Sequence, residues 1–206
     1  MTSPLDALAS GGARILGRPL TAGELEAFGK YLKLLQKWQK SQRLVGSSDT
    51  AWIVEKLFLD SLLFLKVLPS KFVSLADVGS GAGLPGIPLK IVRPGTRSVL
   101  IESRARRASF LSAVIRELGL RNIEVVTARV EDYAAERPAG VEVVVMRCAG
   151  GFGELAAASA PLVIPGGTIV ASGPPHCRPL EHGEWVEVSG LGSGEKRRFA
   201  VLTITA

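Results

Sequence analysis

DVGSGAGLPG, residues 77–86, is the stretch of this sequence that decides its fold. It follows Phe72–Val78, a short apolar run that is typical of a buried strand. Glycines at such a turn permit positive φ angles and let a ligand approach the backbone. Ligands bind at the carboxyl ends of strands in doubly wound sheets, so this turn is expected to hold a cofactor. The alternative is a plain tight connection from strand to helix.

Downstream of the turn, strand-like and helix-like runs alternate. Four further strands are expected, at Ser98–Ile101, Ile123–Val126, Val141–Met146 and Thr168–Ala171. The clearest helix between them carries Phe110, Leu111, Val114, Ile115 and Leu118 on one face. This alternation predicts an α/β fold with a doubly wound, mostly parallel sheet, because each parallel crossover needs a helix. The tail predicts a closing strand pair, Trp185–Val188 and Phe199–Ile204, joined through the glycine-rich Gly190–Gly194.

The segment before this region is expected to form a helical extension. Apolar residues recur at helical spacing from Thr21 to Arg43, and a second helix is expected over Ala51–Val67 with Asp49 or Thr50 as its N-cap. The predicted division is residues 1–68 for the extension and 69–206 for the cofactor-binding domain. The first helix also carries a second row of residues, here called the lysine stripe: Lys30, Lys33, Lys37 and Lys40. The stripe indicates either an RNA-contacting edge or a solvated helix face.

Composition narrows the class of protein. The chain has 206 residues and a formal net charge of +6, a balance that favours an anionic partner such as nucleic acid. Its two cysteines, Cys148 and Cys177, form no CxxC pair, and His176, Cys177 and His182 lack an evident fourth ligand, so no metal is expected. Residues 1–17 have no continuous apolar run of the signal-peptide kind. We expect a cytoplasmic protein that does not enter the membrane and acts as a monomer.

Two cofactors fit the glycine-rich turn. Gly81-x-Gly83-x-x-Gly86 formally matches the dinucleotide fingerprint, which favours NAD. Asp77, however, places a carboxylate where it can meet an ammonium group, which S-adenosylmethionine carries and a pyrophosphate lacks. Glu102 ends the next strand and is suited to accept hydrogen bonds from ribose hydroxyls of either cofactor. After the nucleotide-binding unit, too little chain remains for a usual dehydrogenase substrate domain, so S-adenosylmethionine is favoured.

The longer stretch DVGSGAGLPGIPLKIVRP, residues 77–94, resembles the cofactor loop of the bacterial 16S ribosomal RNA guanine-N7 methyltransferase family, also called glucose-inhibited division protein B. The resemblance runs from about Leu20 to the C-terminus. Further similar residues are Trp38, Lys40 and Leu44; Leu59-Asp60-Ser61-Leu62; Leu100-Ile101-Glu102-Ser103 with Arg106, Arg107, Phe110 and Leu111; Arg129-Val130-Glu131; Met146-Arg147; and Arg197 before the last strand. The Pro165-Gly166-Gly167 turn is also common in methyltransferases. The resemblance implies a Rossmann-like class I methyltransferase that acts on ribosomal RNA or the small ribosomal subunit.

Roles follow for individual positions. The cofactor-binding residues expected from the turn, the strand ends and the resemblance are Asp77, Gly79, Gly81, Gly83, Leu84, Glu102, Val130, Glu131 and Arg147. The residues expected to contact RNA are Lys33, Lys37, Lys40, Arg106, Arg107 and Arg197. Val130 also fits a plain core position, and Arg147 also fits a structural ion pair. No catalytic side chain is assigned, because guanine N7 has a free lone pair and needs no general base.

The sequence departs from the family pattern at four positions. Leu57 replaces the usual His, Gln39 the usual Asn, Ser172 the usual Lys, and Cys148 the usual Ala. These departures leave the cofactor residues intact and concern the choice of target base. Two alternative functions therefore stay open: a methyltransferase for a small molecule or a protein, and a non-catalytic RNA-binding module.

Overall fold

A mixed sheet of seven strands runs through the computed structural model, which describes residues 3–147, 151–173, 179–192 and 194–205. The strand order is β3-β2-β1-β4-β5-β7-β6. The strands are β1 (Ser74–Val78), β2 (Arg97–Ile101), β3 (Ile123–Val126), β4 (Val141–Met146), β5 (Val163–Ser172), β6 (Glu184–Ser189) and β7 (Lys196–Thr203). The first five strands pair in parallel, and β7 pairs antiparallel with β5 and β6. This topology confirms the expected doubly wound sheet.

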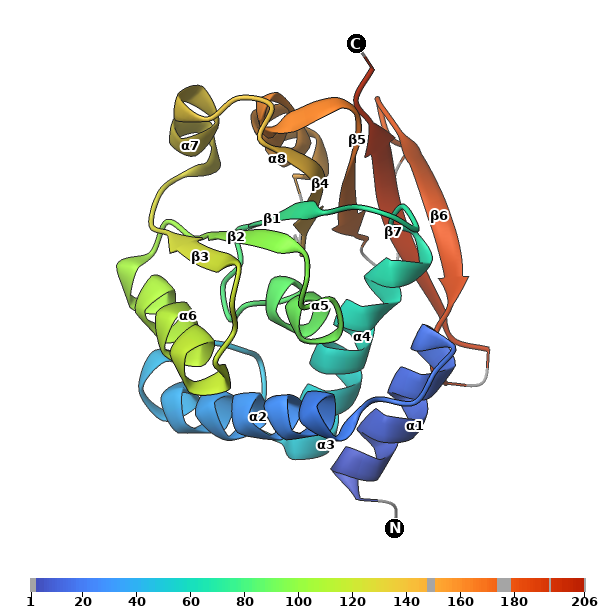
Figure 1. The fold of residues 1–206 in the computed structure, drawn as a ribbon. Coiled ribbons are helices and arrows are strands. Elements are labelled where there is room, and N and C mark those ends of the chain that lie inside the picture. Colours follow the sequence, from blue (N-terminus) through green and yellow to red (C-terminus); the bar gives the residue numbers. More distant parts are fainter. Residues whose placement is uncertain (1–2, 148–150, 174–178, 193, 206) are drawn as a thin grey trace.

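Helices cover both faces of the sheet (Figure 1). On one face lie α5 (Gly86–Val92) and α6 (Ala105–Leu118), and on the other lie α7 (Val130–Glu136), α8 (Phe152–Ser159) and the short η3 (Ala160–Leu162). Side chains alternate along β4: Val143 and Val145 join the core under α5 and α6, whereas Val144 and Met146 join the core under α7 and α8. The nearly continuous apolar run of β4 follows from this burial on both faces.

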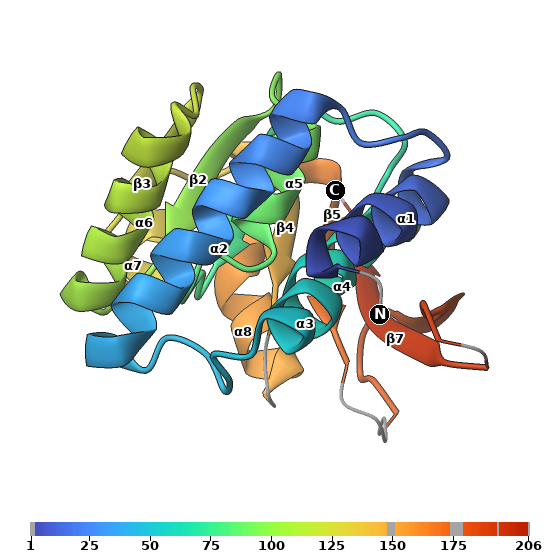
Figure 2. The same cartoon turned by 90° about the horizontal axis from the view of Figure 1, so that it is seen from below.

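The N-terminal helices lie on the same side of the sheet as α5 and α6 (Figures 1 and 2). They are α1 (Pro4–Leu16), α2 (Ala22–Gln42) and one continuous helical run composed of α3 (Thr50–Trp52), the π-helical η1 (Ile53–Leu59), α4 (Asp60–Leu62) and the 3₁₀ turn η2 (Leu63–Lys66). Asp49 caps this run by accepting a hydrogen bond from the Trp52 N–H at 2.7 Å, as one of the two expected caps. The helix α1 was not predicted, although its capping box, Ser3 with Asp6, was readable in the sequence.

One hydrophobic core joins the N-terminal helices to the sheet. Tyr31 and Phe58 share this core with Phe110 of α6, and Trp38 meets the Phe110 ring edge-on at 5.6 Å between centroids. The proposed boundary at residue 68 thus marks a change from helices to a sheet, with a single core across it. None of the helices in the described ranges is both long and apolar enough to cross a membrane.

Two features of the last strands differ from the sequence-based expectation. Pro165-Gly166-Gly167 lies inside β5, at a break in its pairing with β4, and does not form a turn ahead of the strand. Gly166 adopts a φ of 81°, which explains why the strand tolerates the extra residues there. The strand β7 begins at Lys196, so that Arg197 belongs to the strand itself.

Candidate functional site

The glycine-rich turn wraps the carboxyl ends of β1 and β2. The N–H groups of Gly79 and Ser80 donate to the carbonyl of Ile101 at 2.9 and 3.1 Å, which binds the turn to the end of β2. Gly79 has a φ of 67°, and a Cβ built there would meet no atom within 4 Å. The backbone at Gly79 is therefore open enough for a ligand to approach it.

Asp77 lies beneath this turn and is fully buried. Its Oδ2 accepts a hydrogen bond from the Gly86 N–H at 2.9 Å, while Oδ1 is buried and has no hydrogen-bond partner within the described ranges. Burial raises the pKa of this carboxyl from 3.8 to about 7, opposed by the hydrogen bond from Gly86 and by the nearby Ser80 hydroxyl. A buried acceptor without a partner carries a large penalty, so Oδ1 is a position where a cationic group of a ligand would be stabilised.

Glu102 faces the same turn from the end of β2. Its Oε2 accepts from the Gly81 N–H at 2.9 Å, and its Oε1 accepts from the Arg104 N–H at 2.9 Å. Each carboxylate oxygen has a second lone pair, so both can still accept a hydroxyl hydrogen. The two backbone contacts fix the orientation of the carboxylate and leave both oxygens able to accept a further hydrogen bond.

A cavity of about 130 Å³ opens beside Gly79, between the strand ends and α7. Its wall is formed by Val78, Gly79, Ile101, Ser103, Ala128, Arg129, Val130, Glu131 and Leu155. Val130 is 5% exposed and belongs to the core as well, so the two sequence interpretations of this residue are compatible. Ser103 and Leu155 were not predicted. Ser103 follows Glu102 at a strand end and could have been inferred, whereas Leu155 arrives from α8 through tertiary packing alone.

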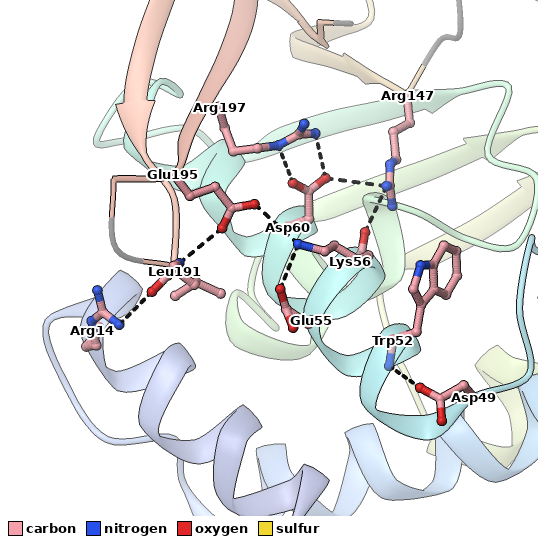
Figure 3. Close-up of polar contacts among 11 residues, drawn as sticks. Arg14, Asp49, Trp52, Glu55, Lys56, Asp60, Arg147, Leu191, Glu195 and Arg197 are labelled. Carbon is pink, nitrogen blue, oxygen red and sulfur yellow. Dashed lines mark hydrogen bonds and ion pairs between the residues drawn. The ribbon is translucent and has the colours of Figure 1, made fainter. Parts of the chain in front are cut away.

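Arg147 directly follows β4 and points toward the N-terminal helices (Figure 3). Its Nη2 lies 3.4 Å from Asp60 Oδ2 and donates to the carbonyl of Lys56 at 2.9 Å. Arg197, from β7, holds the same carboxylate: Nε lies 2.6 Å from Asp60 Oδ1, and Nη2 donates to Oδ2 at 3.1 Å. The ion-pair alternative for Arg147 is therefore present in the structure. Arg197, expected at the RNA, is engaged by Asp60 as well.

A buried tyrosine that the sequence reasoning did not single out supports the glycine-rich turn. The hydroxyl of Tyr31, on α2, donates to the carbonyl of Ala82, and its ring stacks on Phe58 at 4.9 Å between centroids. Burial raises the pKa of the Tyr31 hydroxyl well above its ordinary value, so it stays a donor. Its place three residues after Phe28, on the apolar face, was the available signal.

Apart from Arg197, the residues expected at the RNA occupy two places on the surface. Lys33, Lys37 and Lys40 are exposed and line a hollow of about 570 Å³ together with Gln36, Gln39 and Ser48. Lys30 is set apart from them, because it pairs with Glu26 at 2.8 Å. On α6, Arg106 is exposed, and Arg107 reaches the turn: its Nη1 lies 3.7 Å from where a Cβ of Gly81 would stand.

The remaining predicted positions have local explanations. Leu84 and Gly83 are buried behind the turn, and Leu57 is buried in the core of the N-terminal helices. Gln39 holds the segment after α2, since its side chain accepts from the Val45 N–H and donates to the Val45 carbonyl. Ser172 ends β5 and is buried. Cys148, His176 and Cys177 lie outside the described residues.

Comparison with known proteins bears on this site. A family model described as GidB, rRNA small subunit methyltransferase G, matches residues 24–173. The chain is 43% identical over 122 residues to ribosomal RNA small subunit methyltransferase G of Nitrosococcus oceani, a match that covers 59% of this chain and 56% of the relative. It is 47% identical over 109 residues to the protein of that name from Yersinia enterocolitica, with 52% of each covered. The chain thus spans little more than half the length of these relatives.

Solved structures share the fold at lower identity. TrmN from Thermus thermophilus has a TM-score of 0.52 at 16% identity, covering 71% of this chain and 48% of that protein. The C-terminal domain of precorrin-6Y C5,15-methyltransferase from Rhodobacter capsulatus has a TM-score of 0.51 at 23% identity, covering 71% of this chain and 88% of that domain. The expected Rossmann-like class I methyltransferase fold is confirmed.

Proposed function

Because this chain belongs to the rRNA small subunit methyltransferase G family, we propose that it is an S-adenosylmethionine-dependent enzyme that methylates N7 of a guanine in 16S ribosomal RNA. The observation that carries this proposal is the pair of acids at adjacent strand ends. Asp77 offers a buried carboxylate oxygen without a described partner, and Glu102 offers two oriented acceptors beside the open backbone of Gly79. An ammonium group and a ribose fit these positions, whereas a pyrophosphate would meet the negative charge of Asp77.

The remaining residues of the site have roles that fit this cofactor. Val130 and Glu131 border a cavity that we assign to the adenine ring, and we assign Arg147, which directly follows β4, to the side of the reacting groups. S-adenosylmethionine, when bound, supplies a methyl group on a positively charged sulfur. Tyr31 and Glu102 each form a hydrogen bond to the backbone of the glycine-rich turn, at Ala82 and Gly81, and so limit the movement of a cofactor held by the turn.

The chemistry at the acceptor requires little from the protein beyond position. Guanine N7 is a free acceptor with a lone pair, so no residue has to remove a proton before transfer. Alignment of the acceptor with the methyl group gives the advantage of an intramolecular reaction. A donor aimed at the carbonyl oxygen of the base can hold it in that alignment, and the guanidinium of Arg147 is a candidate for this task.

The form of the RNA follows from access to N7. In A-form RNA, N7 lies in the deep and narrow major groove, so the target guanine should lie in a loop or another open region. Lys33, Lys37 and Lys40 are candidates for contacts with phosphates that flank this region. A ribosomal substrate implies a cytoplasmic enzyme, and action as a monomer stays a prediction.

Transfer of radiolabel from S-adenosylmethionine tests this function. The acceptors are naked 16S rRNA, purified small ribosomal subunits, and an RNA-free cell extract, and labelled RNA is digested to nucleosides for mass spectrometry. We expect 7-methylguanosine in at least one RNA sample and, at a cofactor concentration near the parent's dissociation constant, much less with Glu102→Ala, while Glu187→Ala, a change at an exposed residue of β6, behaves as the parent. Label found only in protein or small molecules would contradict the RNA substrate. Cofactor binding without transfer would indicate a non-catalytic module.

A further inference from the structure

Asp60 brings together two arginines that belong to distant parts of the chain (Figure 3). It lies in α4, within the N-terminal helical region, while Arg147 follows β4 and Arg197 lies in β7. The Asp60 side chain is 9% exposed, against 24% and 25% for the two arginines. A carboxylate buried to this degree requires such partners, because an isolated charge there would be strongly disfavoured.

Asp60 and the π-helix η1 together occupy one of the two terminal nitrogens of the Arg147 guanidinium, Nη2. Nη2 of Arg147 contacts both Asp60 Oδ2 and the carbonyl of Lys56, which is part of η1. A π-helical turn is rare and frequently occurs at functional sites. The carboxylate and the carbonyl approach the same nitrogen from different residues, so they fix the rotation of the guanidinium as well as its position.

The other terminal nitrogen of Arg147, Nη1, is available to donate a hydrogen bond to a bound molecule. Nη1 is buried and has no hydrogen-bond partner among the residues that the structure describes. The guanidinium is also close enough to Tyr31 and Asp77 to interact with both electrostatically, which places it on the side of the glycine-rich turn. A buried N–H without an acceptor is costly, so the geometry calls for an oxygen of a bound molecule at this point.

Resting on the proposed function, we propose that Asp60 is a positioning residue for methyl transfer. It binds Nη2 of Arg147 and thereby directs Nη1 toward an oxygen of one reactant, either the carboxylate of the cofactor or the carbonyl oxygen of the acceptor base. Arg197 pairs with the same carboxylate, with Nε 2.6 Å from Oδ1 and Nη2 donating to Oδ2, and so restrains the rotation of Asp60 relative to Arg147. The N-terminal helices thus contribute to the reaction through the side chain of one aspartate and one backbone carbonyl.

A double-mutant cycle with Asp60→Asn and Arg147→Met tests this inference. Asparagine keeps the shape of Asp60 but loses its charge, and it should lower either cofactor affinity or the single-turnover transfer rate by about tenfold or more. Calorimetry with S-adenosylmethionine alone separates an effect on the cofactor from an effect on the base. If Asp60 acts through Arg147, the double variant should be no worse than Arg147→Met. Independent losses that multiply would overturn the proposal, as would unchanged affinity and rate in Asp60→Asn.

Two further variants separate positioning from simple stability. Glu187→Gln breaks an ion pair between Glu187 of β6 and Lys196, the neighbour of Arg197 in β7. This variant should leave cofactor affinity and transfer rate unchanged. Arg147→Lys can keep a charge contact with Asp60, so this variant should unfold near the parent's temperature. Lysine cannot also present a second nitrogen, so the variant should still lose about tenfold in cofactor affinity or in transfer rate. Full function in Arg147→Lys would overturn the proposal even if Asp60→Asn failed to fold. Absence of transfer in the parent would contradict the proposed function instead, and the cofactor-affinity measurements would then decide the inference.

Discussion

The buried carboxyl of Asp77 predicts that cofactor binding depends on pH. Its pKa of about 7 in the free protein, against 3.8 ordinarily, corresponds to a penalty of about 4 kcal/mol against the charged form. An ammonium group placed against Oδ1 would favour the charged form, so binding of S-adenosylmethionine should drive deprotonation of Asp77. Below pH 7 this deprotonation costs free energy, so the affinity for S-adenosylmethionine should decrease as the pH is lowered.

The magnitude follows from the fraction of protein that has Asp77 ionised. For a pKa of about 7 that fraction is about one half at pH 7 and about 3% at pH 5.5, so the dissociation constant should rise about fifteenfold over this range. The amino group of the cofactor stays largely protonated there, because α-amino groups titrate near pH 8. Calorimetry at both pH values measures the change. Repeating it at pH 7 in buffers of different ionisation enthalpy should reveal release of about half a proton per cofactor bound.

The control is Asp77→Asn, which can retain the hydrogen bond from Gly86 but has no charge to develop. It should bind the cofactor more weakly at pH 7 and show little further change at pH 5.5. The free parent protein should itself lose stability as pH rises from about 4 to about 7, since across that window the folded form retains a proton that the unfolded form has released. Equal affinities of the parent at the two pH values, or the same pH dependence in Asp77→Asn, would refute this reasoning.

Other predictions concern the cofactor, the RNA and the glycines. Glu102→Ala should weaken cofactor binding by about 1–3 kcal/mol because two oriented acceptors are lost, and NAD should not bind; calorimetry checks both, and tighter binding of NAD would contradict the cofactor assignment. Changing Lys33, Lys37 and Lys40 to Gln should weaken RNA binding and reduce the slope of log affinity against log salt concentration by about one unit per lost phosphate contact. Cofactor affinity serves as the internal control, and an unchanged slope would mean that these lysines are solvated surface. Gly86→Ala should lower the free energy of unfolding by about 1–3 kcal/mol, since its Cβ would stand 2.6 Å from both Asp77 Oδ2 and Leu100 Cδ2; denaturant titration measures this, and a neutral effect would mean that the turn can relax. Gly29→Ala, in α2 with open space around the new Cβ, should instead raise the free energy of unfolding by up to about 1 kcal/mol in the same titration, and a loss would contradict the open space seen there.

The sequence by itself determined the parts of this protein that depend on local periodicity and on the turn. Strand-length apolar runs separated by amphipathic helices are compatible with few arrangements other than a parallel sheet covered on both faces. The glycines of residues 79–86 predicted a ligand edge, and Asp77 and Glu102 could be proposed as its acids because each lies close to the end of a predicted strand; that these two strands are neighbours came only from the structure. The strand pair at the C-terminus followed from the same logic.

Tertiary structure decided whatever depends on residues that are distant in sequence. No local pattern could show that Asp60, Arg147 and Arg197 meet, because they come from a helix, the segment directly after β4 and the strand β7, which only the sheet order brings together. The contact of Tyr31 with Ala82 is of the same kind. Nor could the sequence show that burial leaves one oxygen of Asp77 and one nitrogen of Arg147 without described partners, since burial is a property of the assembled core.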